Sequence, residues 1–412
     1  MLAAAPSGRR LGSDWRAARP WSTVGLLAAV AVAVSSLGLL LHPPAGGPDG
    51  GARLWRFAKQ FGQLLVMFAF VAWPLLWTRG RERWDWTRRM LALALLGQLL
   101  YGLAQGALFG RSSPVLAVAE RVFTSNPAIL SGSEELYLGH GFTGIPRLRG
   151  TCCEPLYLGN FLLLALPVLL LPGAGRRHRA LAFGGALLLL LTWSRGAWLA
   201  AGGGAVAWAL LARRAGGGPA DRPAASARRW LAPALLAGAV LAVLLWRPDL
   251  LALPARRLAQ SVNREDWSNL TRLYSMQAAW RAFLLSPVVG VGWGQFGFHF
   301  VALVDPLGLQ SQFSWPVVNS FPLEVLCETG VVGFAVFLAG LALLVRAVRR
   351  GARRVGAGAE GDEARRRIAL LAAATVGVWG QLLTFSQYNL PHIWIALGLL
   401  LAAVRETEGS RG

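Results

Sequence analysis

Long apolar runs separated by short polar stretches recur along the whole chain. The clearest of them, such as residues 22–41 and 323–345, reach the roughly 20 residues that a helix needs to cross a bilayer. The runs lack the alternation of apolar and polar residues that is typical of a barrel strand. Because open backbone hydrogen bonds are costly in hydrocarbon, the pattern predicts an all-α fold, a polytopic transmembrane helical bundle.

The pattern places about ten spans in a single integral membrane domain, residues 1–412. Several cores are short and need flanking residues to span. The first run could be a cleaved signal peptide, but the His-Pro-Pro that follows it is no small-residue cleavage site, so we expect an uncleaved span. The cores are residues 22–41, 61–77, 90–109, 156–171, 180–193, 197–211, 231–246, 323–345, 368–383 and 392–404.

Composition agrees with this picture, since 55% of the residues are hydrophobic and only 15% are charged. The formal net charge of +21 would suggest a nucleic-acid partner in a soluble protein. With the N-terminus inside, however, 27 of the 41 lysines and arginines lie in the inner loops and tails. The positive-inside rule therefore explains most of the charge, predicts cytoplasmic N- and C-termini, and removes the main support for nucleic-acid binding.

Two outside loops, residues 110–155 and 247–322, are too long for simple connectors and are expected to carry function. The second lies between the seventh and eighth spans. The cysteines, Cys152, Cys153 and Cys327, form neither a disulfide framework nor a set with zinc-ligand spacing. We therefore expect no structural disulfide and no metal site.

The segment 269–298 of the larger loop is less apolar than the spans around it. Its spacing predicts an amphipathic helix that carries Arg272 and ends at Pro287, followed by a tight turn through Gly290, Gly292 and Gly294. The alternative for Arg272 is the solvated face of a loop helix. Gly290 and Gly292 are candidates for contact with a substrate.

Two further signals fall on the predicted outer side. In RLRGTCCEPLYLGN, Arg149 and Glu154 precede the fourth span, where a solvated charge pair is the alternative to a site. In TWSRGAW, Ser194 and Arg195 lie between two short apolar runs. An arginine at membrane depth normally faces a polar cavity or a partner, although a snorkelling side chain in a tight hairpin is the other interpretation.

The last signal is PVVNSFPLEVLCETGVVG, in which Asn319 or Ser320 caps a helix with Pro322 in its first turn. Capping accounts for Asn319, and the helix dipole favours Glu324 near the start, so both residues have structural explanations. Beside these, Asn319 is a candidate catalytic residue and Glu324 a candidate substrate ligand.

Arginines held outside the membrane suit a diphosphate, because a guanidinium presents a planar fork of donors and keeps its charge. A lipid-linked sugar diphosphate presents that group at the bilayer surface. Donors aimed at the departing diphosphate lower the barrier to glycosyl transfer without a metal. The outside loops contain no metal-binding acidic cluster, so no cofactor is expected.

The stretches LLLLLTWSRGAW, RLYSMQAAWRAFLLSPVVGVGWGQF and VVNSFPLEVLCETGVVGFAVFL together resemble the successive motifs of the O-antigen ligase and O-antigen polymerase superfamily of bacterial membrane glycosyltransferases. The order, the intervals and the long outside loop before the last motif fit over residues 147–338. Each motif alone is weak, but the ordered set is specific.

The resemblance implies a GT-C-like helical bundle in the bacterial inner membrane, with a periplasmic active site that needs no metal. The implied donor is a glycan on undecaprenyl diphosphate, and the acceptor is the lipid A core or a growing polysaccharide. By position, Arg195 and Arg272 would bind the diphosphate and Arg149 would assist. The motifs do not separate ligase from polymerase.

One departure from the family pattern concerns the acceptor. The family places a His-Asn pair before the helix that holds Glu-Thr-Gly, and that His has been interpreted as the base, whereas this chain has Asn319 and Ser320. Because asparagine is no general base at ordinary pH, the proton acceptor stays open. Glu154, Glu324, Glu265, His392 and deprotonation without a dedicated base are the alternatives.

Two other classes of function compete with the transferase. A transporter or flippase for an anionic or lipid-linked solute could use the same arginines, although the chain lacks the two related halves typical of such folds. A non-catalytic component of a polysaccharide assembly complex is the other alternative, and the missing His favours it slightly.

Overall fold

The computed structural model describes residues 8–45, 47–108, 113–123, 147–213, 267–305, 307, 315–356 and 358–409. The regular elements within these ranges are all helices, which confirms the all-α class. Four helices there are long and apolar enough to cross a membrane, namely Pro20–Leu41, Gly50–Trp77, Gly80–Leu108 and Phe321–Arg354. The count of ten spans and their orientation stay predictions. The seventh predicted span and Glu265 lie outside the described residues.

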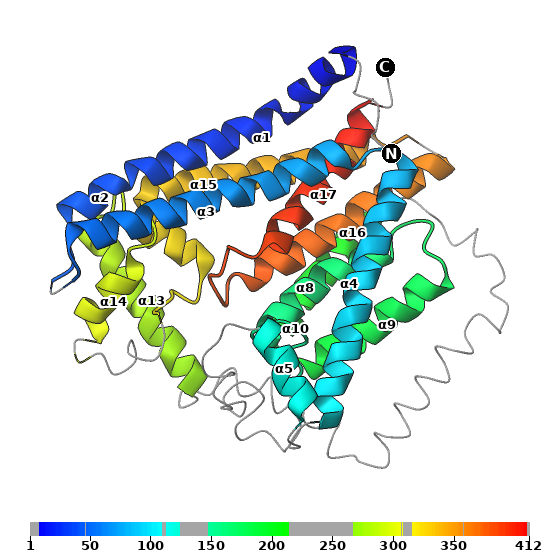
Figure 1. Cartoon of the computed structure of the whole chain (residues 1–412). Helices are drawn as coiled ribbons and strands as arrows, with labels where there is room; N and C mark the ends of the chain where they lie inside the picture. Colours follow the sequence, from blue (N-terminus) through cyan, green and yellow to red (C-terminus); the bar gives the residue numbers. More distant parts are fainter. Residues whose placement is uncertain are drawn as a thin grey trace. The chain divides into compact units, whose positions relative to one another are not determined.

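Each predicted core that falls on described residues coincides with a helix (Figure 1). The helices are α1 (Gly8–Val34), α2 (Ser36–Leu41), α3 (Gly50–Trp77), α4 (Gly80–Leu108), α5 (Pro114–Phe123), α8 (Pro155–Leu169), α9 (Arg176–Leu191), α10 (Arg195–Arg213), α13 (Trp267–Leu285), α14 (Phe296–Val304), α15 (Phe321–Arg354), α16 (Ala359–Gln381) and α17 (Pro391–Gly409). The predicted helix carrying Arg272 is therefore confirmed as α13.

The chain divides into two compact units. Unit 1 comprises Met1–Gly80, Trp267–Val355 and Leu382–Gly412, and unit 2 comprises Arg81–Asp266 and Gly356–Gln381. Unit 1 thus holds α1, α2, α3, α13, α14, α15 and α17, while α4, α5, α8, α9, α10 and α16 belong to unit 2. The single-domain boundary of residues 1–412 stays a prediction.

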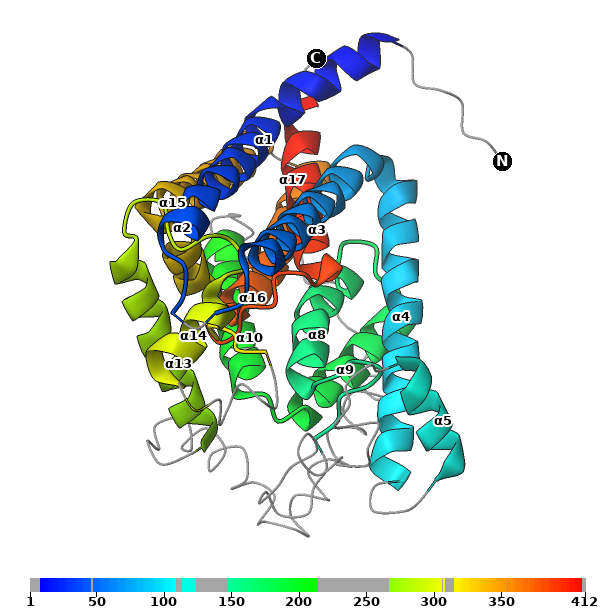
Figure 2. The ribbon, with the colours of Figure 1, turned by 60° about the vertical axis from the view of Figure 1, so that its left-hand side comes forward.

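Within unit 1, α3 packs along α17 and α1 packs along α15 (Figures 1 and 2). The α3–α17 contact is close because Gly398 has no side chain, and a Cβ there would lie 2.5 Å from the carbonyl oxygen of Val71. At the end of α17, the Arg405 guanidinium donates to the carbonyls of Leu75 and Thr78 and so ties the ends of the two helices together. Helix–helix contacts through small residues are typical of membrane bundles.

Within unit 2, α16 packs against α10 and α8. A Cβ on Gly204 would lie 2.7 Å from the Ala373 carbonyl oxygen, so the backbones of α10 and α16 nearly touch. Between α8 and α16, the buried Asn160 amide donates to the side chain of Gln381 at 3.0 Å, and Gln381 donates back to the Leu156 carbonyl at 3.1 Å. This buried polar pair is satisfied, as a low-dielectric environment requires.

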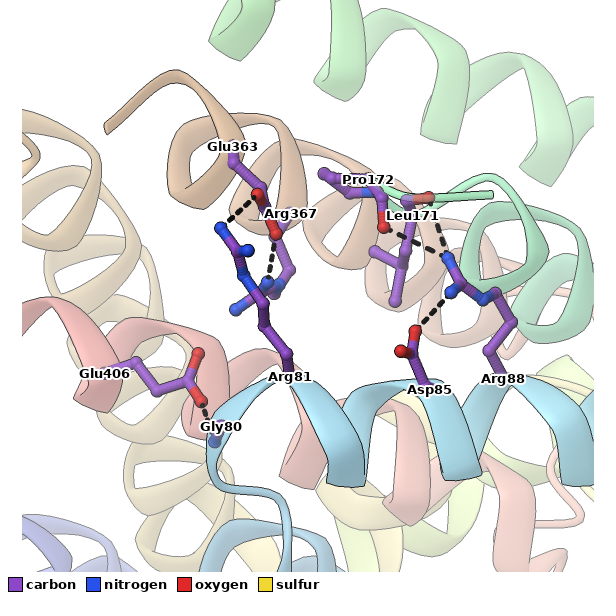
Figure 3. Close-up of polar contacts among 9 residues, drawn as sticks. All are labelled: Gly80, Arg81, Asp85, Arg88, Leu171, Pro172, Glu363, Arg367 and Glu406. Atoms are coloured by element: carbon purple, nitrogen blue, oxygen red, sulfur yellow. Dashed lines mark hydrogen bonds and ion pairs between the residues drawn. The ribbon is translucent and has the colours of Figure 1, made fainter. Parts of the chain in front are cut away.

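Hydrogen bonds and ion pairs of charged side chains stabilise the start of α4 (Figure 3). Arg88 is only 6% exposed and donates to the carbonyls of Leu171 and Pro172, just after α8, while also pairing with Asp85. About two turns before Arg88, Arg81 shares Glu363 of α16 with Arg367. In unit 1, Glu406 of α17 accepts from the Gly80 N–H at 3.0 Å. These contacts give several of the predicted inner arginines a structural role.

Candidate functional site

Residues 192–195 join α9 to α10 and are called the arginine turn. Trp193 has φ of 50°, the left-handed region that a bulky residue rarely adopts. The Thr192 hydroxyl holds this conformation, because it donates to the Leu189 carbonyl at 2.7 Å and accepts from the Ser194 N–H at 3.2 Å. Strain of this kind persists where the surroundings enforce it, and it is concentrated at functional sites.

Ser194 caps α10, since its hydroxyl accepts from the Ala197 N–H at 3.4 Å. Arg195 is the first residue of α10 and is only 8% exposed. The guanidinium charge therefore lies at a helix N-terminus, where the dipole adds further positive potential. The sequence predicted an arginine at a break between two apolar runs, and the structure confirms the break and shows how it is built.

The segment 147–154 lies against the arginine turn. The Leu148 N–H donates to the Leu191 carbonyl at 3.0 Å, and Arg147 donates from Nε to the Thr192 carbonyl at 3.3 Å. From the other side, Gln98 of α4 accepts from the Thr151 N–H at 2.9 Å. Two stretches that the sequence singled out separately are thus neighbours within unit 2.

Arg149 and Glu154 have local structural contacts in this segment. Arg149 is only 2% exposed and donates from Nη1 to the Cys152 carbonyl at 2.9 Å. Glu154 precedes α8 as its N-cap residue, and its backbone carbonyl accepts from the Tyr157 N–H at 3.1 Å. The three cysteines are free, and burial raises the pKa of Cys152 to about 12. Among the described residues, no cluster of His, Cys, Asp and Glu could hold a metal ion.

In unit 1, a hydrogen bond connects Asn319 to α13, the helix that carries Arg272. The Asn319 amide donates to the Ser275 hydroxyl at 3.2 Å, one turn along α13 from Arg272. Ser275 in turn lies 3.0 Å from the Val318 carbonyl, so α13 is bonded to the segment before α15. Asn319 has φ of 59°, which asparagine tolerates better than most residues. The N-cap residue of α15 is Ser320, one of the two residues predicted for this position, although its side chain makes no capping hydrogen bond. The Asn319 side chain contacts α13 instead.

Residues 287–295 follow α13 and are called the glycine loop. Gly290, Gly292 and Gly294 all have positive φ, of 74°, 104° and 77°. The predicted turn through these glycines is therefore confirmed. A Cβ on Gly290 would lie 2.2 Å from the backbone of Glu328, which no side chain could occupy. These contacts account for Gly290 and Gly292 structurally, and direct substrate contact by either of them stays a prediction.

The glycine loop pairs with a break in α15 at Gly330, where φ is 63°. Before the break, the carbonyls of Cys327 and Glu328 accept from the N–H groups of Val291 and Gly292, both at 3.0 Å. After it, the Val331 N–H donates to the Pro287 carbonyl at 2.8 Å. Backbone groups that a broken membrane helix would leave open are thus satisfied by the loop.

Glu328 holds the end of the glycine loop. Glu328 is 1% exposed, and its two carboxylate oxygens accept from the Gly294 N–H at 2.7 Å and the Phe296 N–H at 2.9 Å. The carbonyl of Gly294 is bonded as well, because Arg56 of α3 donates to it from Nε at 2.7 Å. The guanidinium of Arg56 also lies 3.5 Å from the centre of the Trp315 ring.

Tyr388 completes this buried polar cluster. Its hydroxyl accepts from the Trp293 indole at 3.1 Å and lies 2.9 Å from the Gln60 side-chain oxygen. Burial, followed by the nearby Glu324 and Glu328 carboxylates, holds the pKa of Tyr388 well above its usual range. Sequence reasoning missed Arg56, Glu328 and Tyr388. For Glu328 the sequence did offer a signal, because it is an acidic residue within an apolar run. A charged side chain at membrane depth is costly, so it usually has a function.

The candidate residues divide between the units. Arg149, Glu154, Ser194 and Arg195 belong to unit 2, and Arg272, Gly290, Gly292, Asn319 and Glu324 belong to unit 1. Within each unit, the structure brings residues from different motifs together. Residues 180–338 match the family described as O-Antigen ligase. Curated proteins provide no match to the chain.

The O-antigen ligase match begins within α9 and ends within α15. It contains the arginine turn, α13, the glycine loop and Asn319, while Arg149 and Glu154 precede it. The resemblance to the O-antigen ligase and polymerase superfamily is therefore confirmed. The match and the apolar helices together support a membrane protein of polysaccharide assembly with glycan transfer of the ligase or polymerase type.

Proposed function

We propose that the protein transfers a glycan from undecaprenyl diphosphate to a hydroxyl of an acceptor, without a metal, on the periplasmic face of the inner membrane. The acceptor is the lipid A core or a growing polysaccharide. The observation that carries this proposal is the buried Arg195 at the N-terminus of α10, inside the segment that matches the O-antigen ligases. A buried guanidinium at a helix N-terminus is well suited to a diphosphate.

In this mechanism, the Arg195 guanidinium and the positive end of α10 bind one part of the diphosphate. Arg272 on α13 binds another part, and Asn319, which is bonded to the same helix, orients the acceptor. Negative charge grows on the diphosphate as its bond to the sugar breaks. Fixed positive groups stabilise that charge in the transition state more than in the ground state, which lowers the barrier.

The test uses purified protein in lipid nanodiscs with a lipid-linked oligosaccharide donor and a candidate acceptor. We expect glycan transfer by the wild type, and a loss of about a hundredfold or more in Arg195→Ala and in Arg272→Ala. Arg177→Ala on α9 and Arg281→Ala on α13 are matched controls, because both arginines are exposed residues of the helices next to the two sites. Both controls should retain the wild-type rate.

Normal transfer in both arginine variants would refute diphosphate binding by this pair. Movement of the lipid-linked solute without a new glycosidic bond would instead support the transporter alternative. In cells, both variants should remain in the membrane yet lack the surface polysaccharide. Loss of polymer in Arg195→Ala with the assembly complex intact would count against a purely structural component.

A further inference from the structure

Transfer of a glycan to a hydroxyl releases a proton, and some group has to accept it. The acceptor oxygen forms a bond to the anomeric carbon, the bond between that carbon and the diphosphate oxygen breaks, and the diphosphate leaves with the electron pair. The hydroxyl proton must then pass to a base near the acceptor. Asn319 cannot take this role, because an amide does not gain a proton at ordinary pH.

Other groups around the start of α15 are already committed. Both Glu328 oxygens accept buried backbone N–H groups. Tyr388 retains its proton, since burial keeps the pKa of its phenol high. His299 is 2% exposed, and burial, together with the charge of Arg53, lowers its pKa to about 4. None of these three side chains is both basic and available.

Glu324 differs from these groups. It lies in the first turn of α15, where its N–H donates to the Ser320 carbonyl at 2.9 Å, and its side chain is half-buried. Its Oε2 atom is covered and has no hydrogen-bond partner among the described residues. A buried carboxylate oxygen without a donor is costly and needs an explanation, and the hydroxyl of a bound acceptor supplies one.

Three elements surround this carboxylate. Arg56 approaches it from α3, Glu328 lies one turn further along α15, and Ser386 and Tyr388 belong to the segment between α16 and α17. This segment is bonded to the start of α15, because the Phe321 N–H donates to the Leu382 carbonyl at 2.9 Å. The predicted topology assigns the start of α3, the start of α15 and the connection between α16 and α17 to the outer side. In that topology, Glu324 lies on the side of the membrane from which the acceptor would arrive.

We propose that Glu324 is the catalytic base, whose carboxylate removes the proton from the acceptor hydroxyl as the new glycosidic bond forms. This inference rests on the proposed glycan transfer. The Arg56 guanidinium places positive charge near this carboxylate, which favours a charged base at this position. After transfer, the proton leaves Glu324 for solvent, and the base is restored.

The experiment compares Glu324→Gln with Glu324→Asp in the nanodisc assay. Glu324→Gln keeps the shape but loses the base, so kcat should fall about a hundredfold or more while binding of the lipid-linked donor is unchanged. The rise of kcat with pH in the wild type should disappear in Glu324→Gln. In Glu324→Asp, which keeps a carboxylate, a lower kcat with a retained pH dependence is expected.

Two control variants separate this role from a structural one. Glu154→Gln removes the other candidate carboxylate and should leave the rise of kcat with pH intact. Glu328→Gln should lower thermal stability and leave that rise in place. If Glu324→Gln kept the wild-type kcat, or lost activity while its remaining rate still rose with pH, the proposal would be overturned. A wild type that transfers no glycan would instead refute the proposed function itself.

Discussion

In the arginine turn, a tryptophan occupies the left-handed region and side-chain hydroxyls satisfy the backbone. In the glycine loop, glycines occupy that region, and the backbone pairs with the broken helix α15 and with one carboxylate. The first arrangement is small and places a charge at a helix end. The second is more extensive and is held by several backbone hydrogen bonds to α15. We therefore expect changes in the turn to affect function most, and changes in the loop to affect stability most.

The largest loss of stability is expected for Glu328→Ala. The substitution leaves the Gly294 and Phe296 N–H groups without an acceptor in a buried setting. Each orphaned group costs about 1–3 kcal/mol, so the free energy of unfolding should fall by about 4 kcal/mol. Titration of the purified protein with a denaturing detergent measures the change.

Glu328→Gln is the matched variant for this prediction. The amide keeps one acceptor oxygen and replaces the other by a donor, so about half of the loss should return. Equal stability of the wild type and Glu328→Ala would show that the carboxylate does not hold the glycine loop.

A slightly smaller loss is expected for Gly290→Ala. Alanine is strained at φ of 74°, and its Cβ would meet the backbone of Glu328 at 2.2 Å. Strain and displacement together should cost about 3 kcal/mol. The same detergent titration measures it. An unchanged midpoint would mean that the glycine loop moves aside freely, which contradicts its pairing with α15.

The arginine turn should respond in the opposite way. Ser194→Asp keeps an oxygen that caps α10, so the free energy of unfolding should change by less than about 0.5 kcal/mol. Its negative charge beside Arg195 should repel the diphosphate and raise the KM for the donor at least about tenfold. Steady-state kinetics with a lipid-linked donor measures the KM.

Ser194→Asn is the neutral control, because asparagine also caps helices well. It should keep both the stability and the donor KM close to those of the wild type. If Ser194→Asp and Ser194→Asn shared the same KM, the diphosphate would not bind near the arginine turn.

The sequence was sufficient for the helices and for the separate motifs, because apolar runs and glycine spacing are local signals. It could not supply the pairing of residues 287–292 with the break at Gly330, since that pairing joins segments distant in the chain. Arg56 and Tyr388 were missed for the same reason. Arg56 bonds to Gly294, and Tyr388 bonds to Trp293 and Gln60, so each bond joins residues that are far apart in the sequence. Asn319 fitted a local cap pattern, but a contact with α13 determines its position.

The smallest effect, and one of opposite sign, is expected for Gly97→Ala in α4. Gly97 has ordinary helical geometry, and a Cβ there would meet no atom within 4 Å. Alanine costs less conformational entropy than glycine in a helix, so the variant should gain up to about 1 kcal/mol of stability. The measurement is the detergent titration used for Gly290→Ala. If Gly97→Ala lost as much stability as Gly290→Ala, the cost of replacing a glycine would not depend on a left-handed backbone or a close contact. That result would contradict the explanation given for Gly290.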